Sequence, residues 1–208
     1  MSALARTSAI DVVAARAWPS SRERPSRRRE RGWVRAAQEG SDEAMEALFR
    51  VHWGRAHRAA YLIVHDAAAA EDIAQEAFLA AIRALDRFDR RRPFGPWLHR
   101  IVVNRAIDWS RARALRREVW EPVESEAPEE RPDGWSDEVV AALAVLDPDQ
   151  RAAVVLRHLL EYTPGEIAGL LEIPRGTVNS RLRRALDRLA VELEPDRAGE
   201  PLDREAQP

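Results

Sequence analysis

Apolar side chains recur at helical spacing through two stretches of the sequence, and neither stretch shows strand-like alternation. The first stretch opens at Ser41 with a Ser-Asp cap and continues to about Arg117. We expect three helices in it, over 41–65, over about 69–88, and from near Phe94 onward, because each segment carries one apolar face. These faces can bury one another, so the stretch predicts a small helical domain over residues 41–117.

The second stretch, residues 137–193, is divided by Pro148, Pro164 and Pro174. Proline is well placed in the first turn of a helix, where its missing N–H has no partner to lose. Residues 163–166, Thr-Pro-Gly-Glu, also form a capping box. The pattern predicts four short helices and a second domain over residues 137–193.

Three further segments lack a sustained apolar face. Residues 1–40 mix small residues with arginine clusters, and we expect them to be largely disordered; a solvated tail is favoured over a basic arm near DNA. Residues 118–136 crowd acidic residues and prolines, which predicts a flexible acidic linker, and residues 194–208 are expected to form a disordered tail. The predicted fold is all-α, with two small helical domains joined by this linker.

The composition narrows the functional classes. The 208 residues include no cysteine, which excludes disulfides and thiolate chemistry, and all 33 lysine-or-arginine positions are arginine. The five histidines lack metal-ligand spacing and no glycine-rich phosphate loop occurs, so we expect no metal, no cofactor and no catalysis by the chain itself. No apolar run approaches the roughly 20 residues that span a bilayer, and the N-terminus is not a secretory signal. We therefore expect a cytoplasmic protein without direct membrane insertion.

The end of the second domain has the order of a helix-turn-helix. A short amphipathic helix over 163–171 is followed by a turn at 172–174 and a longer helix. The longer helix has an apolar face formed by Val178, Leu182, Ala185 and Leu189, and its remaining surface carries Arg175, Arg181, Arg183, Arg184 and Arg188. Arginine contacts to phosphates supply affinity while contacts to base edges set sequence preference. The pattern therefore favours major-groove binding of DNA over an ordinary solvated helix.

An arginine-rich loop with interleaved aromatic residues leads into the third helix of the first domain. Residues 88–97 read Phe-Asp-Arg-Arg-Arg-Pro-Phe-Gly-Pro-Trp. Aromatic faces stack on unpaired bases while arginines hold the backbone, so the loop is typical of single-strand binding. The alternative is that the rings fill the protein core, and for Trp97 alone we favour that alternative.

Two sets of motifs give the chain a specific resemblance. The first comprises Glu71-Asp72-Ile73-Ala74-Gln75-Glu76-Ala77-Phe78, Phe94, Trp97-Leu98, Ile101, Asn104, Asp108 and Arg111. The second comprises Leu146-Asp147-Pro148, Tyr162, Glu166-Ile167-Ala168, Gly176-Thr177-Val178, Ser180-Arg181-Leu182 and Arg184-Ala185. In order and spacing they resemble the extracytoplasmic-function (ECF) sigma factors of the sigma-70 family. The resemblance implies an alternative sigma factor, which binds core RNA polymerase and directs promoter-specific transcription initiation.

The resemblance also implies a role for each matching position. The first domain would correspond to sigma region 2 and the second to sigma region 4. Contact with the clamp helices of the largest polymerase subunit would be made by Asp72, Gln75, Glu76 and Leu79. The minus-ten element and its melted strand would be bound by Arg90, Arg91, Arg92, Phe94, Trp97, Asn104, Arg105 and Arg111, with Asn104 reading a flipped-out base. The duplex minus-thirty-five element would be bound by Arg175, Thr177, Asn179, Ser180, Arg181, Arg183 and Arg184.

The partners implied by the resemblance are core RNA polymerase, promoter DNA in duplex and single-stranded form, and an anti-sigma factor. The alternative is a helix-turn-helix regulator that binds duplex DNA without joining the polymerase. The arginine-aromatic loop and Asn104 favour the sigma factor, because a duplex reader does not need them. Tight duplex binding by the protein alone would instead indicate the regulator.

Overall fold

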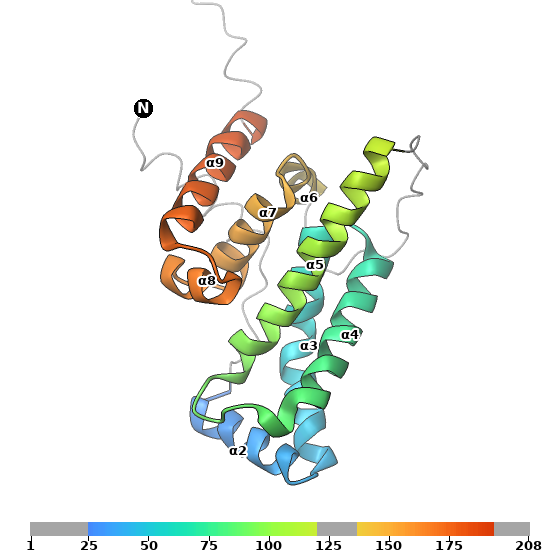
Figure 1. The fold of residues 1–208 in the computed structure, drawn as a ribbon, viewed down its shortest axis with the longest axis vertical. Helices are drawn as coiled ribbons and strands as arrows, with labels where there is room; N and C mark the ends of the chain where they lie inside the picture. The colour runs from blue at the N-terminus through green and yellow to red at the C-terminus, as the bar shows by residue number, and fades with distance from the viewer. Residues whose placement is uncertain (1–24, 120–136, 194–208) are drawn as a thin grey trace, which may run out of the picture.

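Helices form all the regular structure in the described part of the chain. A computed structural model describes residues 25–119 and 137–193, and no strand occurs within them. The first module consists of α2 (Arg27–Gln38), α3 (Asp42–Val64), α4 (Ala67–Ala84), the 3-10 turn η1 (Leu85–Arg87) and α5 (Phe94–Val119). The second module consists of α6 (Asp137–Ala144), α7 (Pro148–Val154), the π-helical turn η2 (Val155–Leu159), α8 (Pro164–Leu171) and α9 (Arg175–Leu193). Figure 1 shows their arrangement, and the all-α prediction is confirmed for these residues.

The predicted linker and C-terminal tail fall almost entirely outside the described residues. Of the predicted linker 118–136, residues 118 and 119 belong to α5, and residues 120–136 lie outside. The predicted tail, residues 194–208, lies outside as well.

Side-chain caps set the boundaries of the first helices. The hydroxyl of Ser41 accepts a hydrogen bond from the N–H of Ala44 (3.2 Å) and starts α3, which ends at His65 with a left-handed φ of 54°. The carboxylate of Asp66 accepts from the N–H of Ala69 (3.0 Å), so α4 begins before the position expected from its apolar pattern. Both are ordinary N-caps, which satisfy donors that the first helical turn leaves without a backbone acceptor.

Helix α2 lies within residues 1–40, which the sequence predicted to be largely disordered, and for residues 27–38 that prediction is wrong. Ser26 caps the helix, and Val34 and Ala37 are buried in the core that α2 shares with α3. The apolar face is short and interrupted by arginines. A helix of this length is stabilised mainly by tertiary packing, which no local sequence pattern reveals.

Helices α3, α4 and α5 form the body of the first module, and α2 lies across one end of them (Figure 1). Leu48, Ile63 and Leu98 are fully buried in this core. Val51 is only partly buried, whereas the adjacent His52 is buried. A polar side chain inside the core requires a hydrogen-bond partner, and the partner of His52 is Glu30 of α2.

In the second module, helices begin at or directly after the prolines that the sequence analysis identified. The side chains and backbones of Thr163 and Glu166 form the predicted capping box, in which the N–H of Thr163 donates to the Glu166 carboxylate at 2.8 Å. Glu172 takes a left-handed conformation (φ 55°) and turns the chain between α8 and α9. Helices α7, α8 and α9 pack together and thus support the helix that carries the arginines.

The two modules pack on each other through α7, which contacts α3 and α5, and through α8, which contacts α5 (Figure 1). The buried guanidinium of Arg151 donates to the carbonyl of Ile63 in α3 at 2.6 Å and to the carbonyl of Leu143 in α6 at 2.9 Å. Burial lowers the pKa of Arg151 to about 10, so the side chain remains charged at neutral pH. His99 and Tyr162 add a 2.7 Å hydrogen bond across the same seam.

Candidate nucleic-acid and polymerase interface

Helix α9 has the two faces that the sequence predicted. Val178, Leu182, Ala185 and Leu189 are buried, and they seat the helix on the rest of the module. The surface on the other side exposes Arg175, Asn179, Arg183, Arg184 and Arg188. A regular helix with this positive surface has the dimensions needed to enter a major groove.

Ser180 and Thr177 are only partly exposed on α9. The hydroxyl of Ser180 donates to the carbonyl of Thr177 at 2.9 Å. Its proton is therefore used by the backbone, while its oxygen can still accept a hydrogen bond from a base or water. The exposed amide of Asn179, next to it, can both donate and accept.

One carboxylate brings together two arginines that the sequence assigned to different DNA elements. Asp149 in α7 accepts hydrogen bonds from Arg111 of α5 at 2.7 and 2.8 Å, and it forms a 3.0 Å ion pair with Arg181 of α9. The hydrogen bond to Asp149 raises the pKa of Arg111. In this arrangement both guanidinium groups, which the resemblance assigned to DNA, face a carboxylate of the protein itself.

The arginine loop between η1 and α5 is a compact turn. The Asp89 carboxylate accepts from the N–H of Arg91 at 2.9 Å, and the Asp89 carbonyl accepts from the N–H of Arg92 at 2.9 Å. These bonds hold the backbone in a fixed turn while Arg90, Arg91 and Arg92 extend into solvent. The three exposed cations therefore form one positive edge at the start of α5.

The aromatic residues of the same loop point inward. Phe94 is only 3% exposed, and its ring centroid lies 6.0 Å from that of Phe88 and 5.6 Å from that of Trp97. Phe88 and Trp97 are also in contact, with centroids 4.5 Å apart. These rings fill the core beneath the loop, so for Phe94 and Trp97 this arrangement favours the core-filling alternative over stacking on bases.

The remaining residues assigned to the minus-ten element lie along α5. Asn104 is exposed, and Arg105 forms an ion pair with Glu76 of α4. Glu76 is one of the residues assigned to polymerase contact, so the two predicted surfaces meet at this pair. Arg111 lies further along α5, at the seam with the second module, where it binds Asp149.

The four residues assigned to polymerase contact form one exposed ridge on α4: Asp72, Gln75, Glu76 and Leu79. The sequence did not predict that Phe49 of α3 and Ile82 of α4 would also be exposed, each 42% accessible. They line an apolar hollow of about 250 Å³ between these two helices. Both positions fit a helical core pattern, so periodicity alone could not distinguish them from buried residues.

Sequence reasoning also missed a buried acid-imidazole pair beneath the loop. Nε2 of His52 lies 2.9 Å from Oε1 of Glu30, and the two side chains are 9% and 12% exposed. Burial raises the pKa of Glu30, but the hydrogen bond and charge of His52 and the backbone N–H groups of Phe94 and Gly95 outweigh it, so the pKa is lowered. The ionised carboxylate only accepts, so the imidazole nitrogen donates.

The described residues contain no group of three or more His, Cys, Asp or Glu side chains arranged to hold a metal ion. Among the helices of 25–119 and 137–193, none is both long and apolar enough to cross a membrane.

Family comparisons cover both modules. Sigma-70 region 2 matches residues 48–116, and Sigma-70 region 4 matches residues 136–189. The ECF RNA polymerase sigma factor SigM of Mycobacterium tuberculosis is 36% identical over 154 residues, which cover 73% of this chain and 78% of that protein. The chain belongs to the ECF family of RNA polymerase sigma factors. The sigma-E factor of Streptomyces avermitilis is 34% identical over 139 residues, covering 66% of this sigma factor and 78% of the relative.

Solved structures that share the fold include a sigma factor. CnrH in complex with the cytosolic domain of CnrY matches with a TM-score of 0.63 and 29% identity, covering 81% of this sigma factor and 99% of CnrH. RpoE from Bartonella quintana, in complex with the anti-sigma factor NepR, matches with a TM-score of 0.60 and 26% identity, covering 73% and 97%. Helix α2 precedes the region 2 match, which begins at residue 48.

Proposed function

We propose that this chain is an alternative sigma factor that binds core RNA polymerase and directs promoter-specific transcription initiation. The observation that carries the proposal is the presence, in one chain and in family order, of a region 2 and a region 4 that each expose a separate arginine surface. The polymerase supplies the chemistry, and the chain itself is not an enzyme. Because bacterial RNA polymerase works in the cytoplasm, we place this sigma factor there.

Helix α9 is proposed to read the minus-thirty-five element in duplex DNA. Asn179, Ser180 and Arg183 are assigned to base edges, since amide, hydroxyl and guanidinium groups match the hydrogen-bonding pattern of the major groove. Contacts to phosphates are assigned to Arg175, Thr177, Arg181 and Arg184. The exposed positive face of α9 and its buried apolar face support this assignment.

The loop before α5 and the exposed surface of α5 are proposed to bind the melted minus-ten element. The three arginines of the loop, Arg90 to Arg92, hold the strand, and the loop and Asn104 together capture a flipped-out base, whose edge the Asn104 amide reads. Arg105 and Arg111 are assigned to nearby phosphates. The exposure of the loop arginines and Asn104 supports these roles, whereas Phe94 and Trp97 are assigned to the core under the loop.

The ridge of α4 is proposed to contact the clamp helices of the largest polymerase subunit. Leu79, 49% exposed, provides an apolar contact next to the charged and polar residues of the ridge, and protein interfaces commonly combine the two. Phe49 and Ile82 extend the apolar surface beside it.

An anti-sigma factor is proposed as a further partner. RpoE from Bartonella quintana, whose structure is similar to this chain, was solved in complex with the anti-sigma factor NepR, and CnrH was solved in complex with the cytosolic domain of CnrY. The chain packs its two modules together through Asp149, Arg151 and their partners, which keeps the arginine surfaces of α5 and α9 in one body.

Co-elution of the purified chain with bacterial core RNA polymerase, followed by transcription from genomic fragments, tests the proposal. We expect stable co-elution and new promoter-specific transcripts. The Leu79→Glu variant should lose co-elution, whereas Leu115→Glu, at an exposed leucine of α5 (63%), serves as the matched control. No association with core polymerase, together with tight duplex binding by the chain alone, would replace the sigma factor by a helix-turn-helix regulator.

A further inference from the structure

The start of α5 lacks a capping residue of its own. Pro93 precedes the first helical residue, Phe94, and has neither an N–H nor a side-chain acceptor. Helices leave their first N–H groups without a backbone partner, and a buried helix start must satisfy them from elsewhere. Asp89, the nearest acid in the loop, is already used by the N–H of Arg91.

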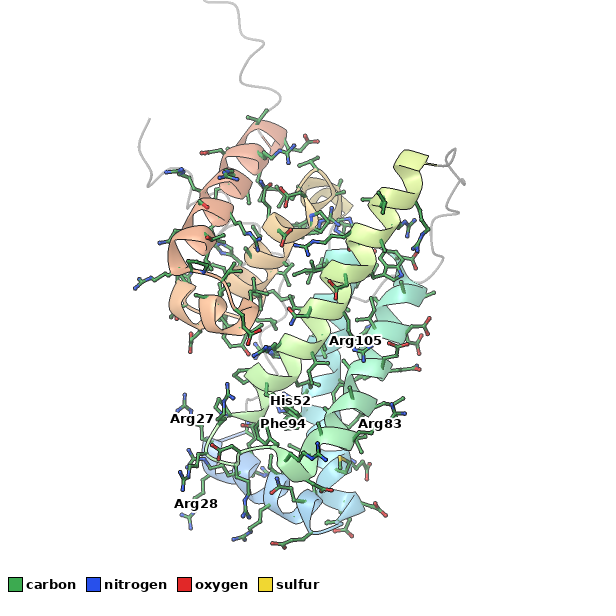
Figure 2. All side chains as sticks on the ribbon, in the orientation of Figure 1. Arg27, Arg28, His52, Arg83, Phe94 and Arg105 are labelled. Atoms are coloured by element: carbon green, nitrogen blue, oxygen red, sulfur yellow. The ribbon has the colours of Figure 1, made fainter. Side chains whose placement is uncertain are left out.

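Helix α2 supplies the missing acceptor from more than 60 residues away. Oε2 of Glu30 accepts from the N–H of Phe94 at 3.4 Å, a pair separated by 64 positions in the sequence. The second oxygen of Glu30 accepts from His52 of α3 at 2.9 Å, which fixes the carboxylate in place. Figure 2 shows His52 beside Phe94 where α5 begins, with Arg27 and Arg28 of α2 pointing away from this site.

Helix α2 also holds the other end of the loop. The side-chain amide of Gln38 donates to the carbonyl of Leu85 at 2.8 Å and to the carbonyl of Phe88 at 3.0 Å. Arg31 adds a longer, exposed contact to the carbonyl of Arg91 at 3.4 Å. Residues of α2 therefore bind the loop before, within and after its three arginines.

The packing beneath the loop is close at Gly95. A Cβ built on Gly95 would lie 3.1 Å from Cε1 of His52, which is tighter than ordinary van der Waals contact. The ring of His52 also contacts the ring of Phe94, with centroids 5.3 Å apart. The imidazole thus supports the start of α5 by packing as well as by orienting Glu30.

We propose that Glu30, Gln38 and His52 are positioning residues for the single-strand-reading loop, and that α2 sets the base preference of the minus-ten site without touching DNA. The proposal rests on the function proposed above for residues 88–94. Reading a flipped base requires that hydrogen-bond donors and acceptors are held within about 0.5 Å of their productive positions. A loop released at either end should therefore discriminate less between the bases of the strand.

Hydrogen exchange of the isolated protein tests the mechanical part of this proposal, whatever the function proves to be. In Glu30→Ala and in Gln38→Ala, the backbone amides of residues 88–95 should exchange faster by about five- to ten-fold, as expected for a lost cap. Glu39→Ala, an exposed acid that follows α2, is the matched control and should not change this segment. Unchanged exchange of residues 88–95 in both variants would overturn the proposal.

Base discrimination by the holoenzyme tests the functional part. The probe is a single-stranded oligonucleotide carrying the non-template minus-ten sequence of a promoter that the wild-type holoenzyme transcribes, and the same oligonucleotide with each base replaced in turn. We expect Gln38→Ala and Glu30→Ala to lose about five- to ten-fold in discrimination at the captured base, while affinity for core polymerase and for a duplex minus-thirty-five fragment stays within about two-fold of wild type. Glu30→Gln, which keeps one acceptor for the N–H of Phe94, should restore part of the discrimination.

The two possible failures are distinguishable. If the wild-type protein neither joins core polymerase nor transcribes, the proposed function fails, while hydrogen exchange still decides whether α2 holds the loop. If the wild type transcribes and both variants discriminate bases as it does, the positioning role fails. If Glu30→Ala lowers all three affinities together through partial unfolding, Gln38→Ala decides, because the partly buried amide of Gln38 donates to the carbonyls of Leu85 and Phe88 at the start of the loop.

Discussion

The two surfaces that we assign to nucleic acid are built in different ways. Helix α9 is positioned by its own hydrogen-bonded backbone and by four buried apolar side chains on one face. The loop of residues 88–94 has no regular backbone pattern, and its ends are held by side chains from α2, with His52 of α3 behind them. One surface is supported locally, and the other depends on residues about 50 to 60 positions away in sequence.

This difference suits the two forms of DNA that the surfaces are proposed to bind. Duplex DNA presents a groove of nearly constant width, so a rigid helix with arginines on one face fits it without further adjustment. A melted strand has no fixed shape, and the protein must supply the geometry that holds an extruded base. We therefore expect damage to the support of each surface to impair one kind of DNA binding and spare the other.

The variant Ile167→Ala should have the largest difference in effect between the two surfaces. Ile167 of α8 is fully buried beside α9, and truncation of such a side chain costs about 2–5 kcal/mol in the free energy of unfolding. Duplex binding through α9 should be lost or strongly weakened, and amides of α9 should exchange faster. Exchange of residues 88–94 should change far less, because α2 rather than α8 holds that loop. Chemical denaturation and hydrogen exchange measure both effects.

Ile167→Val is the matched control, since removing one methylene costs only about 0.5–1.5 kcal/mol. If exchange accelerated equally in α9 and in residues 88–94, the two surfaces would share one structural support. That result would contradict the difference proposed between them.

The same contrast explains which features the sequence could predict. Both faces of α9 and the capping box at Thr163 follow from side chains a few positions apart, and both appear in the structure as expected. Helix α2 could not be predicted in this way, because its apolar face is short and its partners lie in other helices. Nor could the buried position of His52, whose neighbour Val51 fits the apolar pattern equally well.

The sequence alone could also not predict that Asp149 pairs with Arg111 and Arg181. Arg111 belongs to the first module and Arg181 to the second, and the resemblance assigned both to DNA. Only the packing of α7 against α5 and α9 brings a carboxylate to both. Charge patterns along a chain identify cations but do not reveal which anion lies nearest to them in space.

The free energy of unfolding should also depend on pH, with an effect of intermediate size, and this dependence tests whether His65 is buried near Arg151 of the second module in solution. Burial, together with the charge of Arg151 across the seam, lowers the pKa of His65 to about 4. The unfolded chain binds a proton near pH 6.5, whereas the folded chain resists protonation until about pH 4. The free energy of unfolding should therefore fall as the pH drops through this window, by about 3 kcal/mol at most from this residue.

His65→Asn isolates this contribution, because asparagine tolerates the left-handed backbone at this position. Denaturation of both proteins between pH 7 and pH 4 should show that the variant loses less stability than the wild type, by up to about 3 kcal/mol. Parallel pH dependence of the two proteins would mean that His65 is solvated in the folded protein, and that neither burial nor the charge of Arg151 acts on it as the structure indicates.

The smallest expected effect concerns Asp149, which joins the two surfaces by binding one arginine from each. Asp149→Asn keeps the shape of the side chain but removes the charge, so Arg111 and Arg181 become available to phosphates. These ion pairs are partly exposed and are worth less than about 1 kcal/mol, so duplex binding by the free protein should increase about two- to five-fold at low salt. The gain should shrink as salt screens the phosphate contacts.

Asp86→Asn is the matched control, because it removes the same charge from an exposed acid of η1, away from both arginines. It should give no comparable gain in duplex affinity in fluorescence-anisotropy titrations. Equal affinities for the two variants would show that Asp149 does not compete with DNA, and that the surfaces are coupled by packing alone.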